Sequence, residues 1–299
     1  MSFQDKLLDS FIAFEQVIDL ENPIHTDRKN ALKRFESEGF PTKKDELWKY
    51  TSLKSITQRD YSLSVKSNPN IGLKDIKKYS INDIDSFKIV FVDGVFNPFL
   101  SNTTHDGKDI CVLSAALSKS KYKKTIKKYF NKIVPDDQSL ASLNTSYTQE
   151  GAYIRIPKSV LPEDPVQILH FSSGKNKPLW LQPRNLIIVE ENARVEIIER
   201  HQSLRANDGV TNSLTEIYAE KNSFVDYYKI QNDLETSNLI DNTFIDQQRD
   251  SNVRVHTFSF GGKLTRNNLN FYHKGENIQS TLKGLTILES DQHVDHNTL

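Results

Sequence analysis

The chain has 299 residues, of which 36% are hydrophobic and 26% are charged, and it carries few glycines and prolines. This composition is that of a globular protein with a substantial core, and it excludes collagen-like, low-complexity and wholly disordered chains. The 39 basic and 39 acidic side chains give a formal net charge of zero, so there is no general attraction to nucleic acid or to an anionic membrane.

The N-terminal residues do not form a secretory signal. Asp5 and Asp9 interrupt the apolar residues there, and nowhere does the chain approach 18 consecutive apolar residues. We therefore expect a cytoplasmic chain that has neither a membrane nor a nucleic acid as its partner.

Two helices are predicted within the first 40 residues. Apolar residues that recur at three- and four-residue steps share one face of the first helix: Phe3, Leu7, Phe11, Phe14 and Ile18. The second helix is expected to begin after Thr26 and to end at Gly39. Its buried side is expected to comprise Ala31, Leu32 and Phe35.

Further along, residues 87–96 predict a buried strand, an Asp93-Gly94 turn and a return strand. Residues 119–132 then contain seven lysines. Such a segment occurs in helices that bind nucleic acid or membranes. The favoured interpretation is a solvated helix whose Tyr122, Ile126 and Tyr129 point inward at helical spacing.

From about residue 150, short alternating strands separated by polar turns replace the helical spacing. Several strands begin alike, and their apolar anchors lie 30, 28 and 25 residues apart: Val195, Val225, Val253 and Ile278. A repeat of this size is typical of stacked coils in a β-solenoid. The alternative is an antiparallel sandwich, in which turn signals recur about every 8 to 12 residues.

The sequence thus predicts a helical or mixed region over residues 1–145 and a mainly β solenoid core over residues 146–299. No terminal helix or polar capping coil follows the last strand. Because a solenoid needs a cap at each end, we expect the β core to be incomplete at its C-terminal end, with Leu299 as a cut inside the domain.

The familiar catalytic and nucleotide-binding motifs are missing from the sequence. Gly262-Lys263 lacks the first glycine and the final serine or threonine of a phosphate-binding loop, and neither Gly-x-Gly-x-x-Gly nor Gly-x-Ser-x-Gly occurs. Cys111 lies in an apolar run and is predicted to be a buried, inert thiol. Being single, it also excludes an intramolecular disulfide.

Two groups of polar residues are candidate sites. Asp291, His293 and Asp295 would share one face of a strand and suggest a metal site, but a polar outer face with His296 pointing the other way is favoured. Four carboxylates resemble the acid pairs of polysaccharide-cleaving enzymes, but side chains facing water are favoured: Glu190, Glu191, Glu196 and Glu199. We therefore assign no catalytic residue and no metal ligand, and leave the cofactor-binding residues unknown.

Several segments resemble SufD, a scaffold subunit of the SufB/SufD family in the Suf iron–sulfur cluster assembly machinery. They occur in family order along nearly the whole chain: residues 39–53, 143–145, 151–157, 184–199, 261–264, 266–268 and 291–298. The first of these, GFPTKKDELWKYTSL, together with the single cysteine, favours SufD over its paralogue SufB, which carries several functional cysteines.

The resemblance implies a right-handed parallel β-helix flanked by helical regions, and a scaffold that is not an enzyme. It implies pairing with a SufB-like paralogue and a SufC-like ABC ATPase, with a nascent iron–sulfur cluster in the assembled complex and no cofactor on this chain alone. The C-terminal helical segment that docks the ATPase, and a histidine linked to cluster assembly, would lie beyond residue 299, so His293 and His296 are not equated with it. The remaining alternatives are a solenoid interaction module unrelated to iron–sulfur assembly and a β-helix enzyme acting on polysaccharide.

Overall fold

A computed structural model describes residues 2–63, 71–81, 83–103, 108–174, 177–206 and 208–299. The helical elements all precede residue 147: α1 (Phe3–Glu15), α2 (His25–Glu38), η1 (Glu46–Trp48), α3 (Lys54–Thr57), α4 (Leu73–Ile76), η2 (Lys77–Tyr79), α5 (Leu113–Leu117), α6 (Ser120–Tyr129) and α7 (Ser139–Ser146). Within the described residues, no helix is long and apolar enough to cross a membrane.

The predicted helices form with small differences. Phe3, Leu7 and Phe11 are the buried residues of α1, which begins at a Ser2–Asp5 capping box. The helix ends at Glu15, so Ile18 lies outside it, contrary to the prediction.

The second helix, α2, begins at His25, before the predicted start, and Gly39 is its C-cap, where the helix was predicted to end. This residue has a φ of 69°, a value that favours glycine. Leu32 is only half-buried, whereas Arg28, which the apolar pattern did not mark, is buried beside Ala31 and Phe35 and donates to the Thr148 carbonyl oxygen.

The strands stack into a solenoid of about five turns over residues 153–298, which confirms the predicted β-solenoid. One sheet has the order β14-β12-β10-β8-β5-β1-β2 and the other the order β15-β13-β11-β9-β7-β4-β3. The strands of the first sheet are β1 (Phe87–Val92), β2 (Val95–Phe96), β5 (Val166–Ser172), β8 (Arg194–Ser203), β10 (Phe224–Gln231), β12 (Asn252–Phe260) and β14 (Gln279–Ile287). Those of the second are β3 (Asp109–Val112), β4 (Ala152–Ile156), β7 (Arg184–Val189), β9 (Val210–Ala219), β11 (Asn238–Gln247), β13 (Leu264–His273) and β15 (His293–Thr298), and β6 (Trp180–Leu181) pairs with β9.

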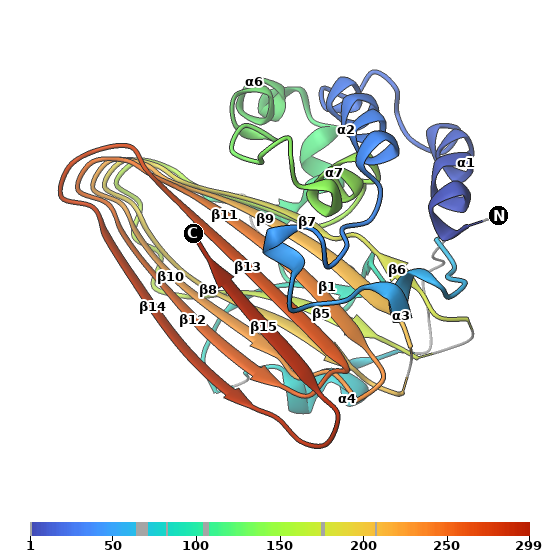
Figure 1. Ribbon diagram of the computed structural model, residues 1–299. Coiled ribbons are helices and arrows are strands. Elements are labelled where there is room, and N and C mark those ends of the chain that lie inside the picture. The colour runs from blue at the N-terminus through green and yellow to red at the C-terminus, as the bar shows by residue number, and fades with distance from the viewer. Residues whose placement is uncertain (1, 64–70, 82, 104–107, 175–176, 207) are drawn as a thin grey trace.

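Each repeat of the sequence contains one residue with a left-handed backbone conformation, and this residue lies at the equivalent turn of successive coils. Asn192, Asn222, Asp250 and Asn277 all have φ between 54° and 62°, a region that Asn and Asp tolerate better than most residues. These residues also contact one another between coils, since Asn222 Nδ2 donates to Asn192 Oδ1 at 2.8 Å and Asn277 Nδ2 to Asp250 Oδ1 at 3.1 Å. In the first sheet, β8, β10, β12 and β14 each begin two residues after this left-handed residue, so the turn fixes where these four strands begin (Figure 1).

The anchor positions pair as predicted in three of the four coils. Val195 pairs with Val225, and Val225 pairs with Val253. The fourth anchor is wrong, because Val253 pairs with Ser280 and not with Ile278. Ile278 comes immediately after the left-handed Asn277 and belongs to the turn, not to β14.

The hairpin over residues 87–96 is confirmed by the antiparallel pairing of β1 and β2 around Asp93-Gly94. Beyond the prediction, β1 also pairs in parallel with β5, and β3 pairs with β4. The division at residue 145 remains a prediction, but three strands from before it, β1, β2 and β3, join the solenoid sheets.

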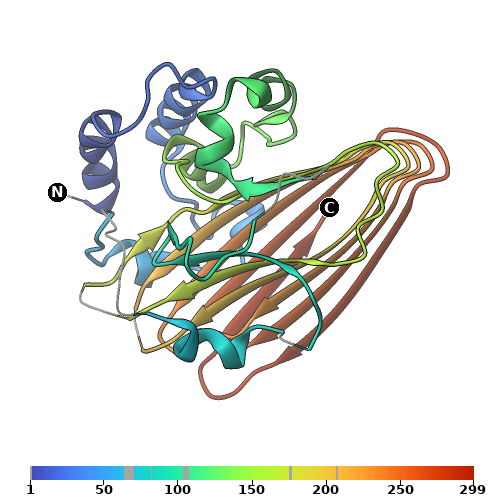
Figure 2. The same cartoon turned by 180° about the vertical axis from the view of Figure 1, so that it is seen from behind.

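The interior between the two sheets is apolar near the Asn-rich turn, where Ile, Val and Ala side chains from both sheets form one cluster. Helices α1, α2, α6 and α7 cover the outer face of the second sheet, and α4 and η2 lie against the outer face of the first (Figures 1 and 2). The lysine-rich segment forms α6, and its Tyr122, Ile126 and Tyr129 are buried as predicted.

Glu150, at the junction of α7 and β4, makes stability depend on pH. Burial raises the pKa of its carboxyl to about 7, although hydrogen bonds from Ser114 and the Gly151 backbone act in the opposite direction. Because the folded state binds this proton more tightly, the stabilisation is complete below pH 4.5, the unfolded pKa, and is lost as the pH rises through 7.

We compare the free energy of unfolding of Glu150→Gln with that of the parent chain. We expect the variant's advantage to be larger at about pH 8 than at about pH 5, by on the order of 2 kcal/mol. Denaturant unfolding at the two pH values measures this gain. Glu163→Gln, in an exposed turn, is the control and should change little. Equal pH profiles for Glu150→Gln and the parent chain would contradict the assignment.

Candidate functional site

The inner face of the first sheet changes from apolar to polar along each strand. In β8, Val195 and Ile197 point into the apolar cluster, and the next inward positions are Glu199 and His201, since side chains alternate in a strand. Parallel pairing of β5 with β8 places His170 directly opposite His201. Three ionisable side chains thereby meet inside the solenoid, and we call His170, Glu199 and His201 the interior triad.

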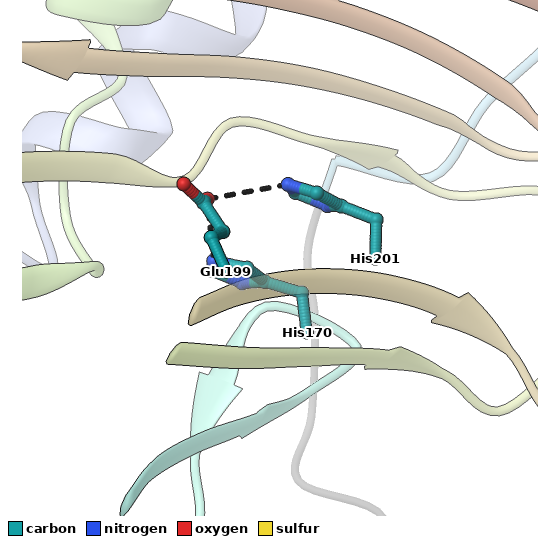
Figure 3. Close-up of side chains that lie close together, drawn as sticks. All are labelled: His170, Glu199 and His201. Carbon is teal, nitrogen blue, oxygen red and sulfur yellow. Dashed lines mark hydrogen bonds and ion pairs between the residues drawn. The ribbon is translucent and has the colours of Figure 1, made fainter. Parts of the chain in front are cut away.

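The carboxylate of Glu199 faces both imidazoles of the interior triad (Figure 3). Its Oε1 atom lies 3.3 Å from His170 Nε2 and 3.2 Å from His201 Nε2. The two rings stack with their centroids 4.7 Å apart at 9°, and Phe91 stacks on the other side of His170 at 5.0 Å. Glu199 is fully buried and both histidines are at most 8% exposed, so the whole group is shielded from solvent.

Burial and mutual charge set the protonation of the interior triad. Burial alone raises the pKa of the Glu199 carboxyl, but the adjoining His170 and His201 bring it well below its usual range. Burial opposes a charge on His201, yet the Glu199 carboxylate raises the pKa of this imidazole, whereas burial dominates at His170 and lowers its pKa. The contacts within the triad therefore favour the charged forms of the Glu199 carboxyl and the His201 imidazole, and burial favours the neutral form of His170.

Neighbouring polar groups fix the Glu199 carboxylate in place. The Tyr227 hydroxyl of β10 donates to Oε2, and Asn185 Nδ2 of β7 donates to Oε1 at 3.0 Å. In the adjoining coil Lys229 forms a buried ion pair with Asp241 and donates to Thr243 Oγ1 at 2.7 Å. Two imidazoles and a carboxylate held in this way can exchange protons or bind a metal ion.

A small cavity lies beside the interior triad. Its volume is about 20 Å³, and its lining includes His170, His201, Leu181 and Asp233. This is room for about one water molecule. The imidazoles of the triad are therefore in contact with a space that a small ligand can occupy.

Sequence reasoning missed the interior triad, although one signal for it was present. Glu196 and Glu199 are three residues apart and so face opposite sides of a strand, and Val195 and Ile197 mark the inward side. The expectation that Glu199 faces water is therefore wrong. Glu196 is half-exposed and pairs with Arg194, while Glu190 and Glu191 pair with Arg155 and Lys158.

The candidate cluster near the last strand is engaged in other contacts. His293 and Asp295 do share one face of β15, where both contact Thr51 and Asp295 pairs with Arg266. Asp291 lies before the strand. His296 points to the other side and contacts Asn267 and Thr286, at 3.2 and 3.0 Å. Over the described residues, the interior triad is the one group of three whose donor atoms converge as metal ligands do.

Cys111 is buried in β3, as predicted, and burial raises the pKa of its thiol to about 11. Because the thiolate is the reactive species, we expect no reaction with a thiol reagent in the folded chain at about pH 8 and full reaction in denaturant. Colorimetric thiol titration measures both. Rapid modification of the folded chain would contradict the assignment.

Comparison with known proteins places both halves of the chain in one family. The model "SufBD protein N-terminal region" matches residues 1–168, and the model "SUF system FeS cluster assembly, SufBD core domain" matches residues 170–299. The two matches follow each other along the whole chain.

Three curated relatives illustrate the similarity. An iron–sulfur cluster assembly SufBD family protein of Synechocystis sp. is 27% identical over 91% of this chain. The SufD protein of Escherichia coli (strain K12) is 23% identical over 87% of the chain, and the SufB protein of Bacillus subtilis (strain 168) is 26% identical over 54%. The matches span 62%, 58% and 35% of these relatives, so this chain corresponds to only part of their length. On the two consecutive family matches, the chain belongs to the SufBD family.

Proposed function

We propose that this chain is part of a SufD-type scaffold subunit that acts in iron–sulfur cluster assembly without catalysing a reaction of its own. In this proposal it works in the cytoplasm with a SufB-like paralogue and a SufC-like ABC ATPase, and the nascent iron–sulfur cluster is carried by the assembled complex. The observation that carries the proposal is the pair of consecutive family matches over residues 1–168 and 170–299.

Two features favour SufD over SufB within the family. The similarity to Escherichia coli SufD extends over 87% of the chain, whereas that to Bacillus subtilis SufB extends over 54%. The single cysteine, Cys111, is buried in an apolar cluster beside α5 and α6. A subunit that accepts sulfur on its own thiols needs accessible cysteines of low pKa, and this thiol has the opposite properties.

The test is co-expression of the natural gene that encodes this chain with the SufB-like and SufC-like genes of the same genome. We expect affinity purification through a tag on this protein to yield both partners in a complex that stays together during size-exclusion chromatography. An unrelated ABC ATPase from the same genome, expressed in place of the SufC-like protein, is the control and should be absent from the complex.

Recovery of neither partner would contradict the proposal. Recovery of the paralogue alone would support pairing within the family and reject the ATPase as a direct or indirect partner. A complex that forms equally well with the unrelated ATPase would also contradict it, because the association would then lack specificity.

A further inference from the structure

We propose that the interior triad, His170, Glu199 and His201, binds one divalent first-row transition-metal ion such as Zn²⁺ or Fe²⁺ inside the solenoid. This inference goes beyond the proposed function and departs from the expectation of no metal ligand. It concerns the isolated chain, so it stands or falls independently of whether the partner proteins bind.

The spacing of the donor atoms fits such an ion. Two imidazole nitrogens and one carboxylate oxygen are the donor set of many zinc and non-haem iron sites. The Nε2 atoms of His170 and His201 lie 3.3 and 3.2 Å from Glu199 Oε1, and all three donor atoms lie within 4.8 Å of one another. In a tetrahedral site with bonds of about 2.0 Å, neighbouring ligand atoms are separated by about 3.3 Å.

A second observation is the state of the His170 side chain. Its Nε2 atom is buried and makes no well-aligned hydrogen bond, although the Glu199 carboxylate lies 3.3 Å away. The His170 ring is stacked between the rings of Phe91 and His201, which hold it in this orientation. Buried polar atoms ordinarily have a partner, and a metal ion bound by the triad supplies one.

The surroundings provide the other parts of a metal site. Tyr227 and Asn185 hold the carboxylate from outside, as the outer residues of metal sites do. The adjoining cavity of about 20 Å³ has room for one water molecule as a further ligand.

The local charge also favours a cation. The carboxylates near His201 are those of Glu199, Asp241 and Asp233, of which Asp241 pairs with the ammonium group of Lys229. Asp233 also faces the guanidinium of Arg200, so the carboxylate that remains without a counter-charge when both imidazoles are neutral is that of Glu199. A divalent cation balances this charge.

Titration of the purified, chelator-treated chain with Co²⁺ tests the inference, because the visible absorption of Co²⁺ reports its ligands. We expect one ion per chain and its displacement by Zn²⁺. His201→Gln is expected to weaken binding more than about 100-fold, since it removes a ligand. Tyr227→Phe should weaken binding about 10- to 100-fold, because it removes only a hydrogen bond to the carboxylate.

The matched control is His256→Gln, the same substitution in the same sheet, at an outward-facing histidine that stacks on Tyr228. It should bind Co²⁺ as the parent chain does. Failure of the parent chain to bind, or equal loss in His201→Gln and His256→Gln, would overturn the inference.

X-ray absorption spectroscopy of the Co²⁺-loaded parent chain decides the matter even if His201→Gln does not fold. Scattering from two imidazoles supports the interior triad. Scattering from oxygen atoms alone, or from a sulfur atom, overturns it.

Discussion

Arg184→Met is expected to lower the free energy of unfolding by about 3–5 kcal/mol, because it leaves a buried carboxylate without its counter-charge. Arg184, the first residue of β7, and Glu216 of β9 are both completely buried, and their side chains pair at 2.5 Å. The guanidinium also donates to Thr145 Oγ1 at 2.9 Å and lies over the Phe130 ring at 4.6 Å. The pair therefore links the second sheet to the helical region that covers it.

Arg194→Met is the matched control for this prediction. Arg194, the first residue of β8, pairs with Glu196, and both side chains are nearly half-exposed. Arg194 also lies 3.3 Å from the buried Asp226, which keeps Arg254 as a partner at 2.8 Å when Arg194 is replaced. Exposed pairs contribute about 0–1 kcal/mol, so little change is expected. Denaturant unfolding of both variants provides the comparison, and similar losses in the two would contradict a structural role of the buried pair.

Gly151→Ala is the other variant with a large expected effect. Steric overlap and backbone strain together are expected to lower its free energy of unfolding by roughly 3 kcal/mol or more. Gly151 has a φ of 154°, and a Cβ atom there would lie 1.8 Å from the Arg184 carbonyl oxygen. The backbone cannot easily move away, since Leu113 N donates to Gly151 O at 2.7 Å and Arg184 N donates to Glu150 O at 2.9 Å.

Gly72→Ala is the control for the glycine variant. Gly72 precedes α4, and a Cβ atom there would meet nothing within 4 Å. We expect it to unfold at the same denaturant concentration as the parent chain within about 0.5 kcal/mol. If Gly151→Ala is as stable as Gly72→Ala, the Gly151 backbone does not lie as close to the Arg184 carbonyl oxygen as the structure places it.

Much of the fold could be predicted because it follows from local signals. The turn residue of each coil and the first inward Val recur at nearly constant spacing, so the coils can be counted from the sequence. The register fails at Ile278 because the turn before β14, residues 274–278, is one residue longer than the turn before β12, residues 248–251, and the position that pairs with Val253 holds Ser280. Periodicity alone does not show where a turn ends. The pairing of β1 with β5 could not be predicted, since it joins residues that are about 80 positions apart.

The interior triad was harder to find than the fold. His170 and His201 meet only because β5 and β8 pair at an offset of 31 residues, and this offset depends on the lengths of the intervening loop and strands. The alternation of Val195, Ile197, Glu199 and His201 did mark the two polar residues as inward-facing. The alternation along β8 could not identify His170 as the third residue, because its position depends on the register between β5 and β8.

The most direct test of a role in iron–sulfur cluster assembly is the activity of iron–sulfur enzymes in cells depleted of the natural gene product. We expect the activity of an iron–sulfur dehydratase to fall, with its polypeptide still present, and to recover when the gene is supplied again. An enzyme without an iron–sulfur cluster should keep its activity throughout. Unchanged dehydratase activity and cluster content after depletion, with no other assembly system active in the cell, would contradict the account.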